Sequence, residues 1–189
     1  YNKKFSVQGF LEKDRIKLIK QRLEKVRKQR DQGRRGRQRS EIPTVSLVGY
    51  TNAGKSTLFN KLTNADVFVA DQLFATLDPT MRRLDIADIG TVIFADTVGF
   101  ISHLPHRLVD AFRATLEEAV SADLLLHVID AAAEDRATNV VRVDEVLKEI
   151  EADRFPSLMV YNKGDLLDDF SPRIDRDSDG MPIAVWVSA

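Results

Sequence analysis

Apolar and polar positions follow two different patterns along the chain, and the pattern changes near Ser40–Pro43. In residues 1–39, apolar side chains recur at spacings of three and four, with Lys and Arg on the other faces: Ile16, Ile19, Leu23 and Val26. This spacing predicts an amphipathic basic helix with a narrow apolar seam, as in one arm of a helical hairpin. Gln32–Arg39 contains two glycines and four arginines, which predicts a flexible basic linker.

Beyond this boundary, short apolar runs alternate with helical patterns. The apolar runs predict strands at residues 45–48, 84–86, 91–95, 124–129, 158–161 and 183–187. The helical patterns cover residues 55–62, 106–120 and 138–150. This alternation indicates an α/β fold of three layers with a mostly parallel sheet. The turn sequence Asp88–Gly90 joins two of the strands directly, so we expect one antiparallel edge strand.

A glycine-rich loop follows the first of these strands and leads into a helix. Residues 49–57 read GYTNAGKST, which fits the phosphate-loop pattern G-x-x-x-x-G-K-[ST] in the required strand-to-helix context. Glycines let the backbone wrap a phosphate, while N–H groups and the helix N-terminus face the anion. We therefore predict a P-loop NTPase fold, with Lys55 at the β- and γ-phosphates and Ser56 on Mg²⁺. The predicted nucleotide contacts are Gly49, Tyr50, Thr51, Asn52, Ala53, Gly54, Lys55, Ser56 and Thr57.

Two further segments fit a nucleotide-dependent switch. Residues 96–99 read DTVG and follow a buried strand, where Asp96 can hold Mg²⁺ through water and the Gly99 N–H can sense a γ-phosphate. The predicted contacts are Asp96, Thr97, Val98 and Gly99. A switch also needs a hydroxyl that reaches the metal only when the γ-phosphate is present. Thr76 and Thr80 in ADQLFATLDPTM, residues 70–81, fit this role equally well.

Residues 162–165 read NKGD and follow a third buried strand. The Asp165 carboxylate can accept hydrogen bonds from N1 and N2 of guanine, whereas adenine would leave it unpaired at a cost. The lysine stem can cover the base, and a backbone N–H near the last residues can reach guanine O6. The predicted base contacts are Asn162, Lys163, Gly164, Asp165, Val187, Ser188 and Ala189. We expect GTP or GDP with Mg²⁺, and this motif disfavours a P-loop ATPase or kinase.

Taken together, these segments resemble the HflX family of ribosome-associated GTPases, within the Obg–HflX group. The resemblance covers about residues 42–189 and rests on SEIPTVSLVGYTNAGKSTLFNKLT, ADQLFATLDPTMRRLD, ADTVGFISHLPHRLVDAFRATLEE and LLLHVIDAA. It implies that the switch threonine is Thr76, with nucleotide contacts at Phe74, Ala75, Thr76, Leu77 and Asp78. It also implies binding to the large ribosomal subunit, splitting or rescue of stalled ribosomes in some members, and acceptance of ATP as well as GTP.

The resemblance further implies what to expect around the chain. An N-terminal domain and a helix following Ala189 belong to the family pattern and are expected outside this sequence, so the GTP-binding domain, residues 40–189, is expected to be truncated at its C-terminus. The family's base motif usually reads NKID, whereas Gly164 stands here in place of Ile. Glycine frees the backbone, so we expect slightly looser base binding.

Catalytic roles are assigned to Lys55, Thr76 and Gly99. Phe100 follows the DTVG motif where Ras-like proteins have a water-orienting Gln, so we expect slow intrinsic hydrolysis and help from a partner or a cation. Asn52 resembles the position at which some GTPases hold K⁺, but an Asn that only tightens the loop explains it equally well. The alternative function is a nucleotide-binding interaction module with negligible hydrolysis. His103 and His106 fit loop or helix-start positions better than catalysis.

Charge separates the two parts of the chain. Residues 1–39 hold 15 Lys and Arg against 4 Asp and Glu, whereas residues 40–189 hold 13 against 25. The basic arm fits contact with nucleic-acid phosphates, and the family resemblance implies that these belong to rRNA and not DNA; the alternative is a helix that its charges merely solvate. The absence of cysteine excludes disulfides and thiolate metal sites and fits a cytoplasmic monomer. No apolar stretch reaches the length of a membrane-spanning helix.

Overall fold

The computed structural model describes residues 15–22, 24–26, 28–29, 32–33, 35–36, 42–64, 80–97, 99 and 121–189. The chain divides into two compact units, Tyr1–Ile42 and Pro43–Ala189. Among the described residues, no helix combines the length and the apolar composition needed to cross a membrane. The helix expected over residues 106–120 lies outside the described residues.

In the first unit, every described residue from 15 to 36 is helical and exposed. Ile16 and Ile19 of the predicted seam are 53% and 63% exposed. The prediction of a non-helical linker at Gln32–Arg39 is wrong for its described residues, since Gln32, Gly33, Arg35 and Gly36 are helical. Arg and Gln are good helix formers, and each glycine costs only about 1 kcal/mol in a helix that has already formed.

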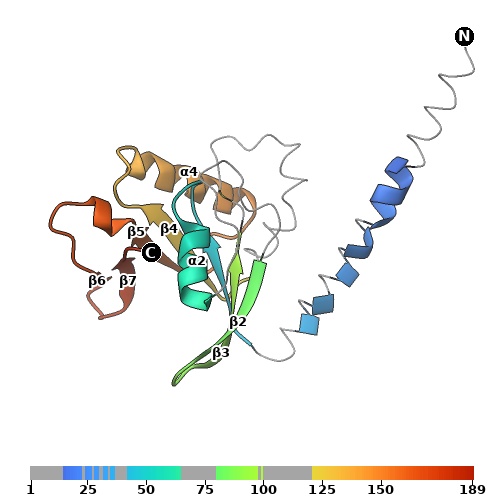
Figure 1. Cartoon of the computed structure of the whole chain (residues 1–189), viewed down its shortest axis with the longest axis horizontal. Helices are drawn as coiled ribbons and strands as arrows, with labels where there is room; N and C mark the ends of the chain where they lie inside the picture. Colours follow the sequence, from blue (N-terminus) through green and yellow to red (C-terminus); the bar gives the residue numbers. More distant parts are fainter. Residues whose placement is uncertain are drawn as a thin grey trace, which may run out of the picture. The chain divides into compact units, whose positions relative to one another are not determined.

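The second unit is built on a seven-stranded sheet with the order β2-β3-β1-β4-β5-β7-β6 (Figure 1). Its strands are β1 (Thr44–Val48), β2 (Thr80–Ile86), β3 (Gly90–Asp96), β4 (Leu124–Asp130), β5 (Ser157–Asn162), β6 (Arg173–Arg176) and β7 (Pro182–Trp186). The helices among its described residues are α2 (Lys55–Thr63), α4 (Arg136–Glu149) and the short 3₁₀ helix η1 (Gly164–Leu166). The predicted α/β fold with a mostly parallel sheet is confirmed.

The parallel strands occupy the middle of the sheet, and both of its edges are antiparallel. β1 pairs with β3 and β4, β4 pairs with β5, and β5 pairs with β7, all in parallel. β2 pairs antiparallel with β3, as the turn sequence Asp88–Gly90 predicted, although β2 begins four residues earlier than expected. The second antiparallel edge, β6 on β7, was not predicted.

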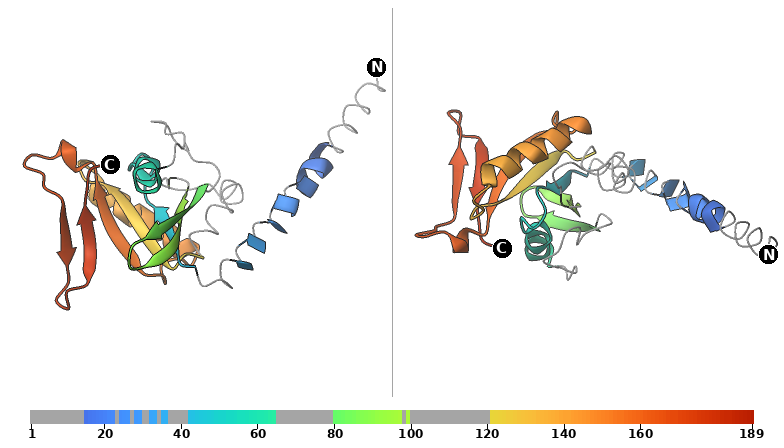
Figure 2. Two further views of the ribbon diagram at one scale, coloured as in Figure 1. Left: turned by 60° about the horizontal axis from the view of Figure 1, so that its bottom comes forward. Right: turned by 90° about the horizontal axis from the view of Figure 1, so that it is seen from above.

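Two helices cover opposite faces of the sheet and form two cores (Figure 2). Successive residues of a strand point to opposite faces, so Leu47 and Val48 of β1 enter different cores. Leu47 packs in the core with Leu58 and Phe59 of α2, whereas Val48 packs in the core with Val143 of α4. The carboxyl ends of the parallel strands therefore meet one edge, where ligands bind in open α/β sheets.

Candidate nucleotide-binding site

The glycine-rich loop between β1 and α2 lies too close to neighbouring atoms for larger residues at two positions. Gly49 has a φ of 147°, and a Cβ on it would lie 2.2 Å from the Val128 carbonyl oxygen of β4. Gly54 has a φ of 89°, and its Cβ would lie 2.3 Å from Nδ2 of Asn162. The loop thus needs glycine for both space and conformation. It leads directly into the N-terminus of α2, which favours an anion.

Lys55 lies buried beneath this loop. Its side chain is 6% exposed, and its ammonium group donates a hydrogen bond to the Tyr50 carbonyl at 2.9 Å. Burial lowers the pKa of Lys55 to about 8, and the nearby Asp96 carboxylate opposes part of that shift. A phosphate bound in the loop would supply a negative charge that stabilises the ammonium form, which burial disfavours.

Ser56 and Asp96 come together as predicted, although they belong to different elements. The Ser56 hydroxyl donates a hydrogen bond of 2.6 Å to Oδ2 of Asp96, which is fully buried at the end of β3. A hydroxyl and a carboxylate are the hard oxygen donors that Mg²⁺ prefers. Within the described part of the chain, no three His, Cys, Asp or Glu side chains gather to hold a metal, so Mg²⁺ would also need phosphate or water oxygens here.

The DTVG segment approaches the phosphate loop at Gly99. A Cβ on Gly99 would lie 2.8 Å from Cα of Thr51 and 3.2 Å from Nζ of Lys55. Thr97 anchors the segment, because its buried hydroxyl donates to the Leu47 carbonyl at 2.5 Å. The backbone at Gly99 therefore lies next to the phosphate loop and Lys55.

Asn162 connects three loops at the end of β5. It is 1% exposed, its amide group donates to the Ala53 carbonyl at 3.2 Å, and its Oδ1 accepts from the Ala189 N–H at 3.1 Å. The NKGD segment is thereby tied to both the phosphate loop and the end of the chain. The Ser188 hydroxyl also donates a hydrogen bond to Oδ1 of Asp165.

Comparison with known proteins agrees with this geometry. The model of the family described as 50S ribosome-binding GTPase matches residues 44–163, which include the phosphate loop, Asp96 and the first two residues of the NKGD motif. This chain belongs to that family. The resemblance to the HflX GTPases is confirmed as well. The chain is 61% identical over 177 residues to GTPase HflX of Escherichia coli K12, covering 94% of this chain and 42% of that protein.

Two further relatives also match most of this chain but less than half of their own length. It is 53% identical over 156 residues to GTPase HflX of Caldanaerobacter subterraneus subsp. tengcongensis, covering 82% of this chain and 36% of that protein. The chain thus spans about two fifths of these curated relatives. A solved GTP-binding protein from Sulfolobus solfataricus in complex with GDP is 32% identical, with a TM-score of 0.56, over 86% of this chain and 47% of that chain.

Several predicted site residues lie outside the part of the chain that the structure describes. Phe74, Ala75, Thr76, Leu77, Asp78 and Val98 lie outside the described residues, as do Phe100, His103 and His106. Of the two threonines considered for the switch, Thr80 is the first residue of β2 and lies opposite Asp96 in the ladder. A residue held in the sheet does not suit a role that requires movement.

Two features of the site were not predicted. Lys163 has a left-handed backbone with a φ of 60°, and its ammonium group lies 2.7 Å from Oδ2 of Asp130, at the end of β4. The signal for Asp130 was its place after a buried apolar run. The second feature is the packing of the Phe170 ring against the Gly164 backbone, where an added Cβ would lie 2.1 Å from the ring.

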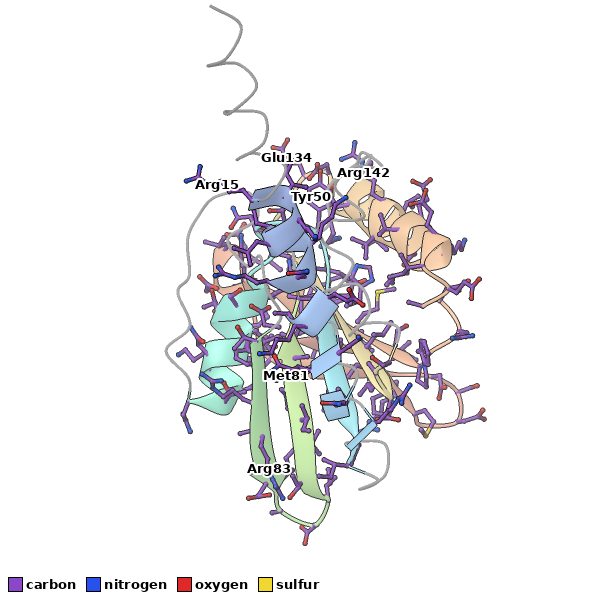
Figure 3. The ribbon with its side chains drawn as sticks, turned by 90° about the vertical axis from the view of Figure 1, so that its right-hand side faces the viewer. Arg15, Tyr50, Met81, Arg83, Glu134 and Arg142 are labelled. Atoms are coloured by element: carbon purple, nitrogen blue, oxygen red, sulfur yellow. The ribbon has the colours of Figure 1, made fainter. Side chains whose placement is uncertain are left out.

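A cavity of about 290 Å³ lies between the phosphate loop and α4. His127 contributes to its lining, and burial lowers the pKa of this imidazole, opposed by Asp144 with Nδ1 3.8 Å from Oδ1. Tyr50 also lines the cavity, and the Arg142 guanidinium lies 5.9 Å from the centre of the Tyr50 ring (Figure 3). The cavity borders Tyr50–Ala53 from the side of α4, so it is part of the surroundings of the phosphate loop rather than of the base motif.

Proposed function

We propose that this chain is the GTP-binding domain of a switch protein that binds GTP or GDP with Mg²⁺, hydrolyses GTP and associates with the large ribosomal subunit. One observation supports this most strongly. Asn162 bonds both to Ala53 in the phosphate loop and to Ala189 in the terminal segment. The loop proposed to bind phosphates and the motif proposed to bind guanine are thereby held next to each other. The family to which the chain belongs is described by GTPase activity and 50S binding.

In this proposal each residue has a defined task. Lys55 neutralises the β- and γ-phosphates, and the N–H groups of the phosphate loop and α2 bind their oxygens. Ser56 and Asp96 are the side chains that would hold Mg²⁺, which would supply positive charge against the phosphates. Thr76 adds the switch hydroxyl. Gly99 presents its N–H to the γ-phosphate, and Asp165 accepts N1–H and N2–H of guanine.

Nucleotide affinity tests the binding half of the proposal. Asp165→Ala removes a carboxylate that accepts two hydrogen bonds, so the affinity for GDP and GTP should fall roughly a hundredfold. Isothermal titration of GDP, GTP and ATP measures the change. Asp168→Ala is the matched control, because Asp168 is an exposed aspartate in the same loop. Equal GDP affinity in the two variants would contradict the role of Asp165.

Hydrolysis is expected to be slow in the isolated protein, because Phe100 cannot orient water by hydrogen bonding. Single-turnover GTP hydrolysis should accelerate when large ribosomal subunits are added. The alternative, an interaction module with negligible hydrolysis, predicts no turnover under either condition. An isolated protein that turns over as fast as the ribosome-bound one would contradict the expectation, and parallel assays with ATP test whether adenine is accepted.

A K⁺ ion near Asn52 is the proposed source of extra positive charge. Asn52 has a φ of 60°, a conformation that Asn adopts more readily than most residues, so the loop geometry alone also accounts for it. Repeating the hydrolysis assay in KCl and in NaCl separates the two explanations. Faster hydrolysis in KCl supports the ion, and equal rates remove it.

Ribosome association extends the proposal to the longer protein that the relatives represent. In that protein the basic arm, residues 1–39, would form a helical linker that contacts rRNA, and the whole would act as a monomer in the cytoplasm. Splitting or rescue of stalled ribosomes is the proposed outcome of GTP-dependent binding. Sedimentation of the protein with large subunits, in GTP and in GDP, tests the association directly.

A further inference from the structure

Gly164, the third residue of the NKGD motif, is buried in the 3₁₀ helix that carries Asp165. Its backbone is not among the described residues with positive φ, so its conformation alone does not require glycine. The expectation that Gly164 acts by freeing the backbone is therefore not the physical reason for this residue. The reason lies in the space around its Cα.

The aromatic ring of Phe170 fills that space. A Cβ placed on Gly164 would lie 2.1, 2.2 and 2.5 Å from three carbons of the Phe170 ring, which is far inside van der Waals contact. Any side chain at position 164 would thus displace the ring. Gly164 and Phe170 form a complementary pair, in which the absence of one side chain admits the other.

The chain path between these residues brings the ring back onto the motif. The Leu167 N–H donates to the Gly164 carbonyl at 2.9 Å and closes the 3₁₀ turn. Asp169 then adopts a left-handed conformation with a φ of 54°, directly before Phe170. Such a conformation is uncommon for a residue other than glycine and is maintained by surrounding contacts. The left-handed turn at Asp169 directly precedes the residue whose ring packs against Gly164.

Gly164 is held from the other side as well. Its N–H donates to the Val187 carbonyl at 3.0 Å, and the following residue, Asp165, accepts a hydrogen bond from the Ser188 hydroxyl. Gly164, the residue before Asp165, is therefore held between the Val187 carbonyl and the Phe170 ring. The Asp165 side chain itself is exposed, so its direction depends on this backbone support together with the Ser188 hydrogen bond.

We propose that Phe170 is a positioning residue for guanine recognition: its ring, seated on Gly164, fixes the Asp165 carboxylate at the angle needed for N1–H and N2–H. This inference rests on the proposed function, because it assumes that Asp165 reads guanine. It assigns a specificity role to a residue outside the NKGD motif. It also explains why glycine at position 164 accompanies an aromatic ring at position 170 in this chain.

The test compares GDP with IDP, whose hypoxanthine base lacks the N2 amino group. Phe170→Ala should lower GDP affinity roughly tenfold, the loss of one well-aligned hydrogen bond to a charged group, and should lower IDP affinity less. The GDP-to-IDP affinity ratio therefore falls. Gly164→Ala should have a similar effect, because its methyl group expels the ring. The double variant Gly164→Ala/Phe170→Ala should bind no worse than Phe170→Ala alone.

Leu166→Ala is the matched control, since Leu166 belongs to the same 3₁₀ turn but is 64% exposed. Its GDP-to-IDP ratio should equal that of the wild type. Thermal unfolding shows whether each variant is folded, and Phe170→Leu replaces Phe170→Ala if the latter is not. An unchanged ratio in the folded Phe170 variant overturns the inference. So does a Gly164→Ala penalty that is equally large with and without Phe170.

Failure of the inference can be told apart from failure of the proposed function. Wild-type protein that binds GDP, combined with an unchanged ratio in the variants, overturns only the role of Phe170. Wild-type protein that binds no guanine nucleotide overturns both. Loss of the ratio in Asp165→Ala together with its partial loss in Phe170→Ala supports both.

Discussion

The Lys55 ammonium group sits under the phosphate loop, where it donates to the Tyr50 carbonyl at 2.9 Å. Burial lowers its pKa to about 8, so near neutral pH it carries a charge that its surroundings disfavour. Bound phosphates reverse this, because an opposite charge within a few ångströms favours the ammonium form. The free protein thus holds a lysine whose protonation is coupled to binding.

A pH dependence of nucleotide binding follows from this coupling. Above pH 8 the free protein has mostly neutral Lys55, and binding must take up a proton to restore the ammonium group. GDP affinity should therefore fall as the pH rises from 7 to 9, with a slope approaching about tenfold per pH unit above the free-state pKa. Titration calorimetry in buffers of different ionisation enthalpy measures the proton uptake.

Absence of proton uptake at pH 8.5, with constant affinity between pH 7 and 9, would contradict a lowered pKa at Lys55. Below pH 7 the lysine is protonated with and without nucleotide, so this residue should contribute no slope there. Measurement at pH 6.5 therefore serves as the internal control.

Single residues also show where sequence reasoning reaches its limit. Asn162 and Asp165 were predicted as base contacts from their motif alone. The structure adds that Asn162 bonds to both the Ala53 carbonyl and the Ala189 N–H. Ala53 lies 109 positions before Asn162 in the sequence, so the motif alone could not reveal this contact. Asp130 and Phe170 were not predicted, because their roles depend on where Lys163 and Gly164 lie in the folded chain.

At the scale of elements, burial decided which strands could be predicted. β1, β4 and the end of β3 are buried on both faces, and such strands appear in the sequence as continuous apolar runs. β6 has three charged residues in four and only one apolar residue, Ile174, so its sequence carries no such run. β6 is a strand because it pairs with β7, and its composition gives no sign of that pairing.

In the β2–β3 hairpin, the turn was predicted from the sequence but the start of β2 was not. Its turn was found because Asp88 and Gly90 tolerate positive φ, and they adopt 64° and 97°. The first four residues of β2, TMRR, were missed because two arginines hide the strand pattern. The reverse error occurred at Gln32–Arg39, where glycine suggested a break although the described residues continue as helix. Local composition thus misled where pairing or an existing helix determined the structure.

At the scale of the whole molecule, the two units differ in charge. The described basic residues of the first unit are exposed, and the GTP-binding unit is acidic. An exposed basic helix in one unit and an acidic composition in the other suit separate tasks, with contact to RNA phosphates proposed for the first and nucleotide binding for the second.

Neutralising the arm tests this division of labour. Replacing four exposed basic residues by Gln should weaken binding to large ribosomal subunits without changing GDP affinity: Arg15, Lys17, Lys20 and Arg22. Each lost phosphate contact should reduce the slope of log affinity against log salt by roughly 0.7–0.9. Filter binding across a salt series measures both quantities.

Four exposed basic residues of the second unit provide the matched control: Lys61, Arg83, Lys148 and Arg176. Their replacement by Gln removes the same formal charge from a surface with no assigned RNA contact. An arm variant with the same salt slope as this control would show that the arm charges only solvate the helix.

The two antiparallel edges of the sheet have a consequence for behaviour at high concentration. β2 presents Arg82, Arg83 and Asp85, and β6 presents Arg173, Asp175 and Arg176; Met81 and Arg83 mark the course of β2 in Figure 3. An unpaired edge strand is a template for another chain, and charged side chains along it oppose such pairing. The charged residues of both outer strands therefore disfavour hydrogen bonding between the sheet edges of two molecules, which opposes aggregation.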